Sequence, residues 1–445
     1  MMIIKRKIYN KLLYWKRNNG KTALLIEGAR RTGKSFIATQ FAKNEYKSFI
    51  IVDFSLENPS VLDLFNTGFN DLDEFFIKLQ FIFNTKLYNR NSLIIFDEVQ
   101  LFPKARQVIK HLVADGRYDF IETGSLISLK QNVQDILIPS EEESITLFPL
   151  DFEEFLWAIG DEISFSFIKD RFDNFTALDE VSHKIMLKKF RTYMLVGGMP
   201  QAVIKYIETN DLELVDNVKK NILSLYRKDV GKFAGNNFSK VLNIFDEIPA
   251  NLSRHDKKFS LASLNKNARF RDYEDSFIWL KEAMITNCCF RVSDPSIGMG
   301  LSMDSSYMKN YMMDTGLLIT LAFFNNKFLD NKLYKALLED KLNINEGMIV
   351  ENAVAQILRT NGHDLFFYSQ VNESRHRMEV DFLLRKNNKI IPVEVKSSSY
   401  TKHKSLDYLR EIHKKKIGKS YIIYTKNLKK IDDVYCIPLY MSIFL

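Results

Sequence analysis

Residues 22–35 read TALLIEGARRTGKS, which has the spacing of the phosphate-binding loop G-x-x-x-x-G-K-[ST]. Glycines at both ends of such a loop let backbone N–H groups face phosphates. The ammonium of Lys34 can then reach the β- and γ-phosphates, and the hydroxyl of Ser35 can ligate Mg²⁺. The pattern predicts an ATP site formed by Gly28, Ala29, Arg30, Arg31, Thr32, Gly33, Lys34, Ser35 and Phe36.

Two further apolar segments end in polar side chains that suit the same chemistry. NSLIIFDEVQ ends in Asp97, which can hold the water shell of Mg²⁺, and Glu98, which can polarise the attacking water. YDFIETGS ends in Thr123 and Ser125, and either hydroxyl could sense the γ-phosphate. The sequence leaves open which of the two does so, and a plain turn is the alternative.

These residues need a parallel sheet to bring them together. The apolar strand TALLI precedes the loop and the periodic segment FIATQFA follows it, which is the strand–loop–helix context that the motif requires. A further strand is predicted over 48–54. Strands that alternate with helices predict an α/β fold with a parallel sheet.

A second group of charged residues stands near the end of the chain, in EVDFLLRKNNKIIPVEVKSSS. The stretch predicts a β-hairpin with its turn at KNNK. Because side chains alternate along a strand, Glu379 and Asp381 share one face, as do Glu394 and Lys396. The hairpin brings the two pairs together, and Glu351 on the preceding helix could lie over them.

The segment between these ends reads mainly as helix. From 151 to about 230 the apolar spacing is helical, which suits a lid over a nucleotide. Residues 237–292 predict three short helices, in VLNIFDEIPANLS, FSLASLNKN and YEDSFIWLKEAMI, and then a strand. That order is typical of a winged helix, which binds DNA or serves as a protein–protein module. Phosphate contacts are expected from Lys266, Arg269 and Arg271.

Composition sets the broad class. A chain of 445 residues is too long for one ordinary core and predicts several domains. The net charge of +8 permits a polyanionic partner without requiring one. Three cysteines cannot make a disulfide framework, and no Cys/His metal spacing is present. No apolar run approaches the ~18 residues of a membrane helix, so we expect a cytoplasmic protein without membrane contact.

Several segments resemble the bacterial and archaeal AAA-type ATPases (AAA+ superfamily) with a C-terminal PD-(D/E)XK restriction-endonuclease-like domain of unknown function. They are GARRTGKS, LIIFDEVQ, IETGSL, LFPLDFEEFLWAIG, YMLVGGMPQAV, KNYMMDTGLL and EGMIVENAVAQIL, in order along essentially the whole chain. The resemblance implies an α/β protein with four parts: an ATPase core at 1–150, a helical lid at 151–232, a winged-helix-like domain at 233–325 and a nuclease-like domain at 326–445. Many relatives have a Gly-Arg pair where this chain has PSEEES, so no arginine finger is assigned.

The resemblance also implies roles for the C-terminal charged residues. Glu351, Asp381 and Glu394 would hold Mg²⁺, and Lys396 would position the water or stabilise charge, which makes Asp381, Glu394 and Lys396 the catalytic set. Three interpretations stay open. The charges are solvent-facing cross-strand pairs worth about 0.2–1 kcal/mol each, or an inherited fold binds nucleic acid without cutting it, or the domain is an active metal nuclease.

We therefore expect an ATPase that uses Mg²⁺, with Lys34 and Glu98 as its catalytic residues, and that couples hydrolysis to the binding or cleavage of DNA or RNA. A homo-oligomer is left open. The alternative is a nucleotide-gated regulatory switch that binds protein partners and carries an inactive nuclease-like domain. A small-molecule kinase is disfavoured, because nothing downstream reads as a small-substrate pocket.

Overall fold

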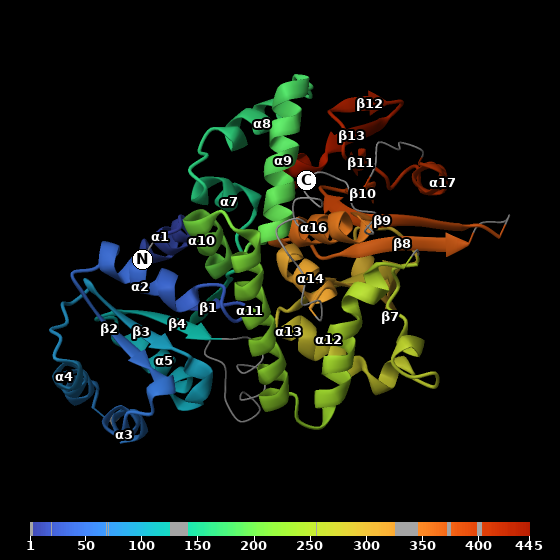
Figure 1. The fold of residues 1–445 in the computed structure, drawn as a ribbon. Coiled ribbons are helices and arrows are strands. Elements are labelled where there is room, and N and C mark those ends of the chain that lie inside the picture. Colours follow the sequence, from blue (N-terminus) through green and yellow to red (C-terminus); the bar gives the residue numbers. More distant parts are fainter. Residues whose placement is uncertain are drawn as a thin grey trace. The chain divides into compact units, whose positions relative to one another are not determined.

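The computed structural model describes residues 3–18, 20–67, 69, 71–124, 141–254, 256–324, 346–371, 375–397 and 403–445. These residues form two compact units (Figure 1). The N-terminal unit is mainly Lys5–Phe148, and the C-terminal unit is mainly Pro149–Lys281 and Ile285–Leu445. No helix within the described ranges is long and apolar enough to cross a membrane.

The N-terminal unit is built on five parallel strands in the order β2-β3-β4-β1-β5. The strands are β1 (Ala23–Glu27), β2 (Ser48–Asp53), β3 (Ser92–Asp97), β4 (Asp119–Gly124) and β5 (Glu142–Thr146). The helices are α1 (Ile8–Lys16), α2 (Lys34–Glu45), α3 (Pro59–Thr67), α4 (Leu72–Phe83) and α5 (Pro103–Asp115). The predicted parallel α/β sheet is confirmed.

Side-chain alternation gives each face of this sheet its own core. Leu24 of β1 and Ile95 of β3 pack in one cluster with residues of α1 and α2. Leu25 and Ile94, the next residues along the same strands, pack on the other face with residues of α3, α4 and α5. The basic helix α1 is held by this packing, since its Trp15 is buried in the first cluster.

The C-terminal unit begins with helices, as predicted for the segment from 151 to about 230. They are α7 (Phe152–Ala158), α8 (Ser164–Asp173), α9 (Glu180–Val196), α10 (Pro200–Thr209) and α11 (Leu212–Phe233). α7 starts with a capping box, in which Asp151 and Glu154 each accept a hydrogen bond from the other's backbone N–H. The turn before α10 requires Gly198, because a Cβ there would lie 2.2 Å from the carbonyl oxygen of Leu150.

The next segment departs from the predicted three helices. α12 (Phe238–Leu252) and α13 (Glu274–Glu282) form, but FSLASLNKN contains only a 3-10 turn at Leu261–Ser263. The cause is local, because the backbone N–H of Asn267 donates to the side chain of Asn265 at 3.0 Å and stabilises a turn instead of a helix. The prediction of a helix here is wrong.

A mixed sheet of eight strands, in the order β12-β13-β11-β10-β9-β8-β6-β7, forms the rest of the C-terminal unit. The strands are β6 (Thr286–Val292), β7 (Met303–Met312), β8 (Phe366–Val371), β9 (Arg377–Lys386), β10 (Lys389–Val395), β11 (Ser420–Tyr424), β12 (Lys429–Ile431) and β13 (Val434–Pro438). The helices are α14 (Thr315–Ala322), α16 (Glu346–Thr360) and α17 (Lys404–Ile412), with a 3-10 helix, η8, at Leu439–Phe444. The hairpin of β9 and β10 was predicted, and β11, β12 and β13 follow it near the chain end.

Strands β6 and β7 lie in the same sheet as the strands near the chain end. β6 pairs in parallel with β8, with Phe290 opposite Phe366, and pairs antiparallel with β7. The predicted boundary between 233–325 and 326–445 therefore does not separate two sheets, because this parallel pairing crosses it. The four-part division of the chain stays a prediction.

Candidate functional site

The predicted phosphate-binding loop has the required backbone shape. Arg31 and Gly33 have positive φ angles of 71° and 96°, so the chain turns sharply before α2 begins at Lys34. The hydroxyl of Thr32 donates to the carbonyl oxygen of Ala29 at 2.9 Å and braces the loop. The side chains of Thr32 and Lys34 are buried, whereas Arg30 and Arg31 are exposed.

The side chain of Lys34 lies inside the loop whose bound phosphates it is expected to contact. Its ammonium donates to the carbonyl oxygens of Gly28 and Ala29, both at 3.0 Å. Burial lowers the pKa of Lys34 to about 8, although the nearby carboxylates of Glu98 and Asp97 act in the opposite direction. A buried ammonium among carbonyl oxygens and helix N–H groups is suited to a phosphate.

Three oxygen-bearing side chains meet at the carboxyl ends of neighbouring strands. The hydroxyl of Ser35 donates to Oδ1 of Asp97 at 2.7 Å, and the hydroxyl of Thr123 donates to the same oxygen. These residues come from α2, β3 and β4, and β3, β4 and β1 are adjacent in the sheet. A hydroxyl and a carboxylate at this place fit Mg²⁺, which prefers oxygen ligands and the phosphates of a bound nucleotide.

Glu98 stands next to this group in a left-handed conformation, with φ of 54°. Its carboxylate accepts a hydrogen bond from the side-chain amide of Gln100. That bond holds the carboxylate, whose charge acts on Lys34 together with that of Asp97. Ser125, the other candidate sensor, lies outside the described residues, so Thr123 is the one that the structure brings to Asp97.

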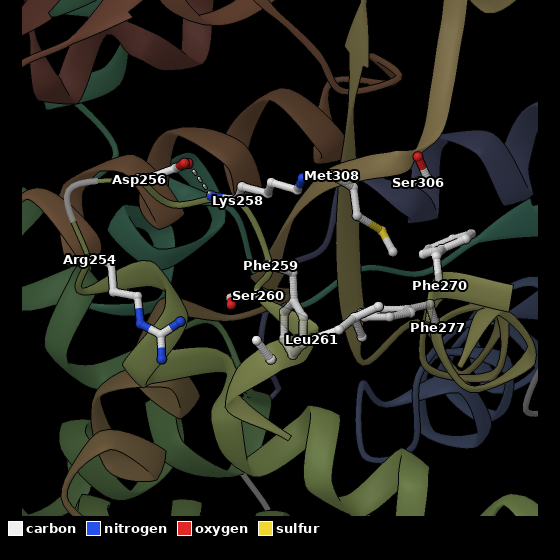
Figure 2. Close-up of a pocket in the computed structure, with 11 residues that line it drawn as sticks. Arg254, Asp256, Lys258, Phe259, Ser260, Leu261, Phe270, Phe277, Ser306 and Met308 are labelled. Carbon is white, nitrogen blue, oxygen red and sulfur yellow. Dashed lines mark hydrogen bonds between the residues drawn. The ribbon is translucent and has the colours of Figure 1, made fainter. Parts of the chain in front are cut away.

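A pocket of about 470 Å³ opens in the C-terminal unit (Figure 2). Its lining is Arg254, Asp256, Lys258, Phe259, Ser260, Leu261, Ala262, Phe270, Phe277, Ser306 and Met308. The ring of Phe277 is stacked on that of Phe270, with centroids 6.0 Å apart, and meets Phe259 edge to face at 5.0 Å. The pocket thus combines an aromatic wall with the cations of Arg254 and Lys258.

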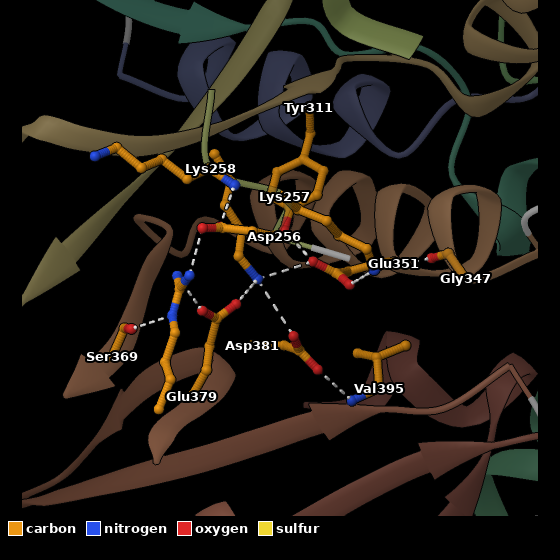
Figure 3. Close-up of polar contacts among 12 residues, drawn as sticks. Asp256, Lys257, Lys258, Tyr311, Gly347, Glu351, Ser369, Glu379, Asp381 and Val395 are labelled. Carbon is orange, nitrogen blue, oxygen red and sulfur yellow. Dashed lines mark hydrogen bonds and ion pairs between the residues drawn. The ribbon is translucent and has the colours of Figure 1, made fainter. Parts of the chain in front are cut away.

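The carboxylates of Glu351, Glu379 and Asp381 point toward one another in the C-terminal unit (Figure 3). The ammonium of Lys309, on β7, lies 2.8 Å from Glu379, 3.1 Å from Glu351 and 3.3 Å from Asp381. Lys257 forms a second ion pair with Glu351. Burial alone would raise the pKa of Glu351, but the charges of Lys309 and Lys257 lower it to about 2.

The remaining residues of the predicted set lie beside this cluster. Asp381 accepts a hydrogen bond at 2.9 Å from the backbone N–H of Val395, and burial, followed by the charge of Glu351, raises the pKa of Asp381. Glu394 pairs with Lys396, so the E-x-K residues contact each other. Burial raises the pKa of Glu394. In the described part of the chain, no three His, Cys, Asp or Glu side chains are arranged to hold a metal ion.

Three sequence families match this chain. Residues 20–156 match the family described as "AAA domain", and this range contains the loop, Asp97 and Thr123. Residues 20–156 form an AAA-type ATPase-like domain. Residues 187–327 and 346–441 match two domains of unknown function, DUF8612 and DUF4143. No curated protein matches the sequence.

Solved structures give weaker likenesses. The Holliday junction branch migration motor RuvB of Thermotoga maritima is 13% identical over 64% of this chain and 89% of its own, with a TM-score of 0.28. Caenorhabditis elegans PCH-2 is 11% identical over 48% and 69%, with a TM-score of 0.28. Drosophila ORC bound to DNA is 13% identical over 65% and 87%, with a TM-score of 0.27. Scores this low carry no argument, so the assignment of the AAA-type domain rests on its sequence family.

Two basic residues that the sequence analysis did not single out belong to these sites. In the N-terminal unit, the guanidinium of Arg6 donates to the carbonyl oxygens of Thr32 at 3.2 Å and Phe148 at 2.6 Å, which ties the loop to the end of the unit. In the C-terminal unit, Lys309 lies at the centre of the carboxylates. Arg6 stands in a generally basic segment, whereas the letters KNYMMD offered a weak signal for Lys309, a lysine in an apolar strand.

Proposed function

We propose that the AAA-type domain binds ATP with Mg²⁺ and hydrolyses it, and that the C-terminal unit binds nucleic acid in a way that depends on the nucleotide. The convergence of Ser35 and Thr123 on one oxygen of Asp97, beside the buried ammonium of Lys34, carries the first half of this proposal. We also propose the four parts predicted from the sequence, namely an ATPase core, a helical lid, a winged-helix-like domain and a nuclease-like domain. The last two of these parts contribute strands to one sheet.

Each residue of the AAA-type site has a separate task. The loop amides and Lys34 bind the phosphates, and Ser35 and Asp97 hold Mg²⁺, which neutralises charge on the β- and γ-phosphates. Glu98 orients the attacking water and accepts its proton. Thr123 links β4 to Asp97 through a hydrogen bond, so the loss or gain of the γ-phosphate changes the contacts at the end of β4.

The test separates binding from hydrolysis. Lys34→Ala removes the main cationic contact to the phosphates, so we expect ATP affinity and turnover to fall by about 100-fold or more. Glu98→Gln keeps the side-chain volume, so affinity stays within a few-fold of the wild type while kcat falls by about 100-fold or more. The measurements are calorimetry with ATP and Mg²⁺ and a phosphate-release assay.

Lys43→Ala is the matched control, because Lys43 is an exposed lysine in the last turn of the same helix. It should bind and hydrolyse ATP as the wild type does. Unchanged turnover in Lys34→Ala would refute the site, and equal losses of binding and turnover in Glu98→Gln would show that Glu98 is structural.

The pocket in Figure 2 supports the second half of the proposal. Bases stack on aromatic side chains while cations contact the phosphates, and this combination binds single strands with little sequence preference. Phe270 offers a half-buried ring, backed by the buried ring of Phe277, and Arg254 and Lys258 offer the charges. Asp256 also lines the pocket, but its carboxylate is engaged by Arg377.

Fluorescence anisotropy with labelled single-stranded DNA and RNA tests this half. Affinity should fall steeply between 50 mM and 200 mM salt, and Arg254→Ala with Lys258→Ala should lower it about tenfold or more. Lys184→Ala, an exposed lysine on α9, is the control. Absence of salt-dependent binding, with ATPase activity intact, would favour the nucleotide-gated switch that binds protein partners.

A further inference from the structure

We infer that Lys309, supported by Lys257, takes the cation position of the C-terminal carboxylate cluster, so that this unit binds its ligand without a metal ion and does not cut nucleic acid. The inference deepens the proposed function, since it decides what the C-terminal unit does with a bound strand. It is independent of ATP hydrolysis by the other unit.

The position of Lys309 is set by the fold. The residue lies on β7, pairs in register with Cys289 of β6, and has an exposed fraction of 1%. Its ammonium contacts three carboxylates within 3.3 Å and stands 5.1 Å from the ring centroid of Phe367. A buried ammonium is stable only when it has partners of opposite charge. The three carboxylates therefore allow Lys309 to be buried.

The oxygens that would ligate a metal are already engaged. In Glu351, Asp381 and Glu394, five of the six carboxylate oxygens accept a hydrogen bond or ion pair. The donors are Lys257, Lys309, Tyr311, Lys396 and the backbone N–H of Val395. Of these six oxygens, only Oε2 of Glu394 is buried without a partner among the described residues, and one oxygen does not make a metal site.

The surrounding charges are balanced without a divalent ion. Arg377 pairs with Glu379 at 2.6 Å and also with Asp256, and the charge of Lys258 acts on Asp256 as well, so two cations face the two outer carboxylates. Lys309 and Lys257 neutralise the inner ones. A divalent ion at Glu351 and Asp381 would have to displace the ammonium of Lys309, which contacts these two carboxylates and that of Glu379. As they stand, the residues do not fit Mg²⁺, in contrast to Ser35 and Asp97 of the AAA-type domain.

A metal-rescue experiment tests the inference on the full chain. Every variant carries Asp97→Asn, so that the AAA-type site contributes no response to metal. With Lys309 intact, 1–10 mM Mn²⁺, on the order of the weakest protein sites, should leave the midpoint of thermal unfolding unchanged. Lys309→Met should lower that midpoint by roughly 5–10 °C, because it leaves buried carboxylates without their cation.

Mn²⁺ should then restore part of the loss in Lys309→Met, and Asp381→Asn added to that variant should abolish the restoration. Lys389→Met, an exposed lysine on β10, is the control and should change neither the midpoint nor its response to metal. A Mn²⁺ response with Lys309 intact that disappears with Asp381→Asn would overturn the inference, and so would Lys309→Met without any loss of stability.

A second measurement needs no Lys309 variant. The wild type should leave plasmid DNA and structured RNA intact with Mg²⁺ or Mn²⁺, with and without ATP, over a time in which it binds single strands. Cleavage that Asp381→Asn abolishes would overturn the inference. Failure of the proposed function looks different, since it would appear as lost ATP turnover or lost strand binding with no change in these readouts.

Discussion

Gly28 shows how closely the phosphate-binding loop is packed. A Cβ at this position would lie 2.4 Å from the carbonyl oxygen of Leu147, and the obstacle is backbone, which cannot rotate away. Leu147 is itself held in place, because its N–H donates to the carbonyl oxygen of Glu27 at 2.7 Å. The glycine is therefore needed for close approach of two chain segments, in addition to its part in the motif.

Gly28→Ala should destabilise the N-terminal unit by about 1–3 kcal/mol, as overpacking does, and should weaken ATP binding because the loop must shift. Chemical denaturation and calorimetry measure the two effects. Gly300→Ala is the control, since no atom lies within 4 Å of a Cβ built there. Equal stability of the two variants would show that the contact with Leu147 relaxes easily.

Single residues also show what the sequence could and could not predict. Lys34 and Ser35 follow from local spacing, because their task depends on neighbours within one turn of loop and helix. Lys309 and Arg6 act on partners 42 and 142 residues away, respectively. No local pattern encodes such a distance. The shape of the loop around Lys34 was therefore predictable, whereas the cation inside the carboxylate cluster was not.

At the scale of elements, a buried histidine joins α9 to the chain end. Nε2 of His183 lies 3.2 Å from the carbonyl oxygen of Thr425, so this nitrogen must donate. Nδ1 then accepts from the hydroxyl of Tyr440, at 2.9 Å. The neutral ring satisfies both partners, and burial lowers the pKa of His183.

This arrangement predicts a pH dependence. Because the pKa of His183 is lower in the folded state than its usual ~6.5, the unfolded chain takes up a proton first as the pH falls. Stability from this residue is complete above about pH 6.5 and declines below it. The charged groups that act on His183 are Glu180, Lys184 and Lys426.

The unfolding free energy of the C-terminal unit should therefore fall from pH 7.5 to 5.5, and the fall should be smaller in His183→Gln. That variant should also be less stable at pH 7.5, since it fills the site less well. Denaturation curves at both pH values measure the difference. Parallel losses in the two proteins would show that His183 titrates normally.

Elements were predicted best where their pattern is long and regular. Strands β1 to β4 and helices α9 to α11 follow directly from the apolar pattern, whereas β5 was not predicted. The helix predicted in FSLASLNKN does not form, because the side chain of Asn265 accepts from the backbone N–H of Asn267 and stabilises a turn. The partner of β6 could not be read from the chain, since parallel pairing with β8 joins residues 76 apart, as from Phe290 to Phe366.

At the scale of the whole molecule, each unit has a core of its own. The N-terminal unit buries apolar residues on both faces of its sheet, and the C-terminal unit has a separate cluster that includes Val380, Leu383 and Ile422. Only the first contains the loop with Lys34. A ligand of that loop should act on one core and leave the other unchanged.

Thermal unfolding should therefore show two transitions, and ATP with Mg²⁺ should raise only one of them. At a ligand concentration 100 times Kd, the gain is about 2.7 kcal/mol. Differential scanning calorimetry of the wild type and Lys34→Ala measures it, and the variant should lose the shift. One transition that moves as a whole would show that the two units unfold cooperatively.

The pairing of β6 with β8 has a practical consequence for anyone who divides this protein. A fragment that stops near residue 325 would keep β6 and β7 but lose β8. The edge of β6 that pairs with β8 would then be left with unpaired backbone groups. Open strands of this kind recruit other chains. Expressed separately, the pieces on either side of that cut should therefore precipitate or self-associate, and mixing them should recover soluble material.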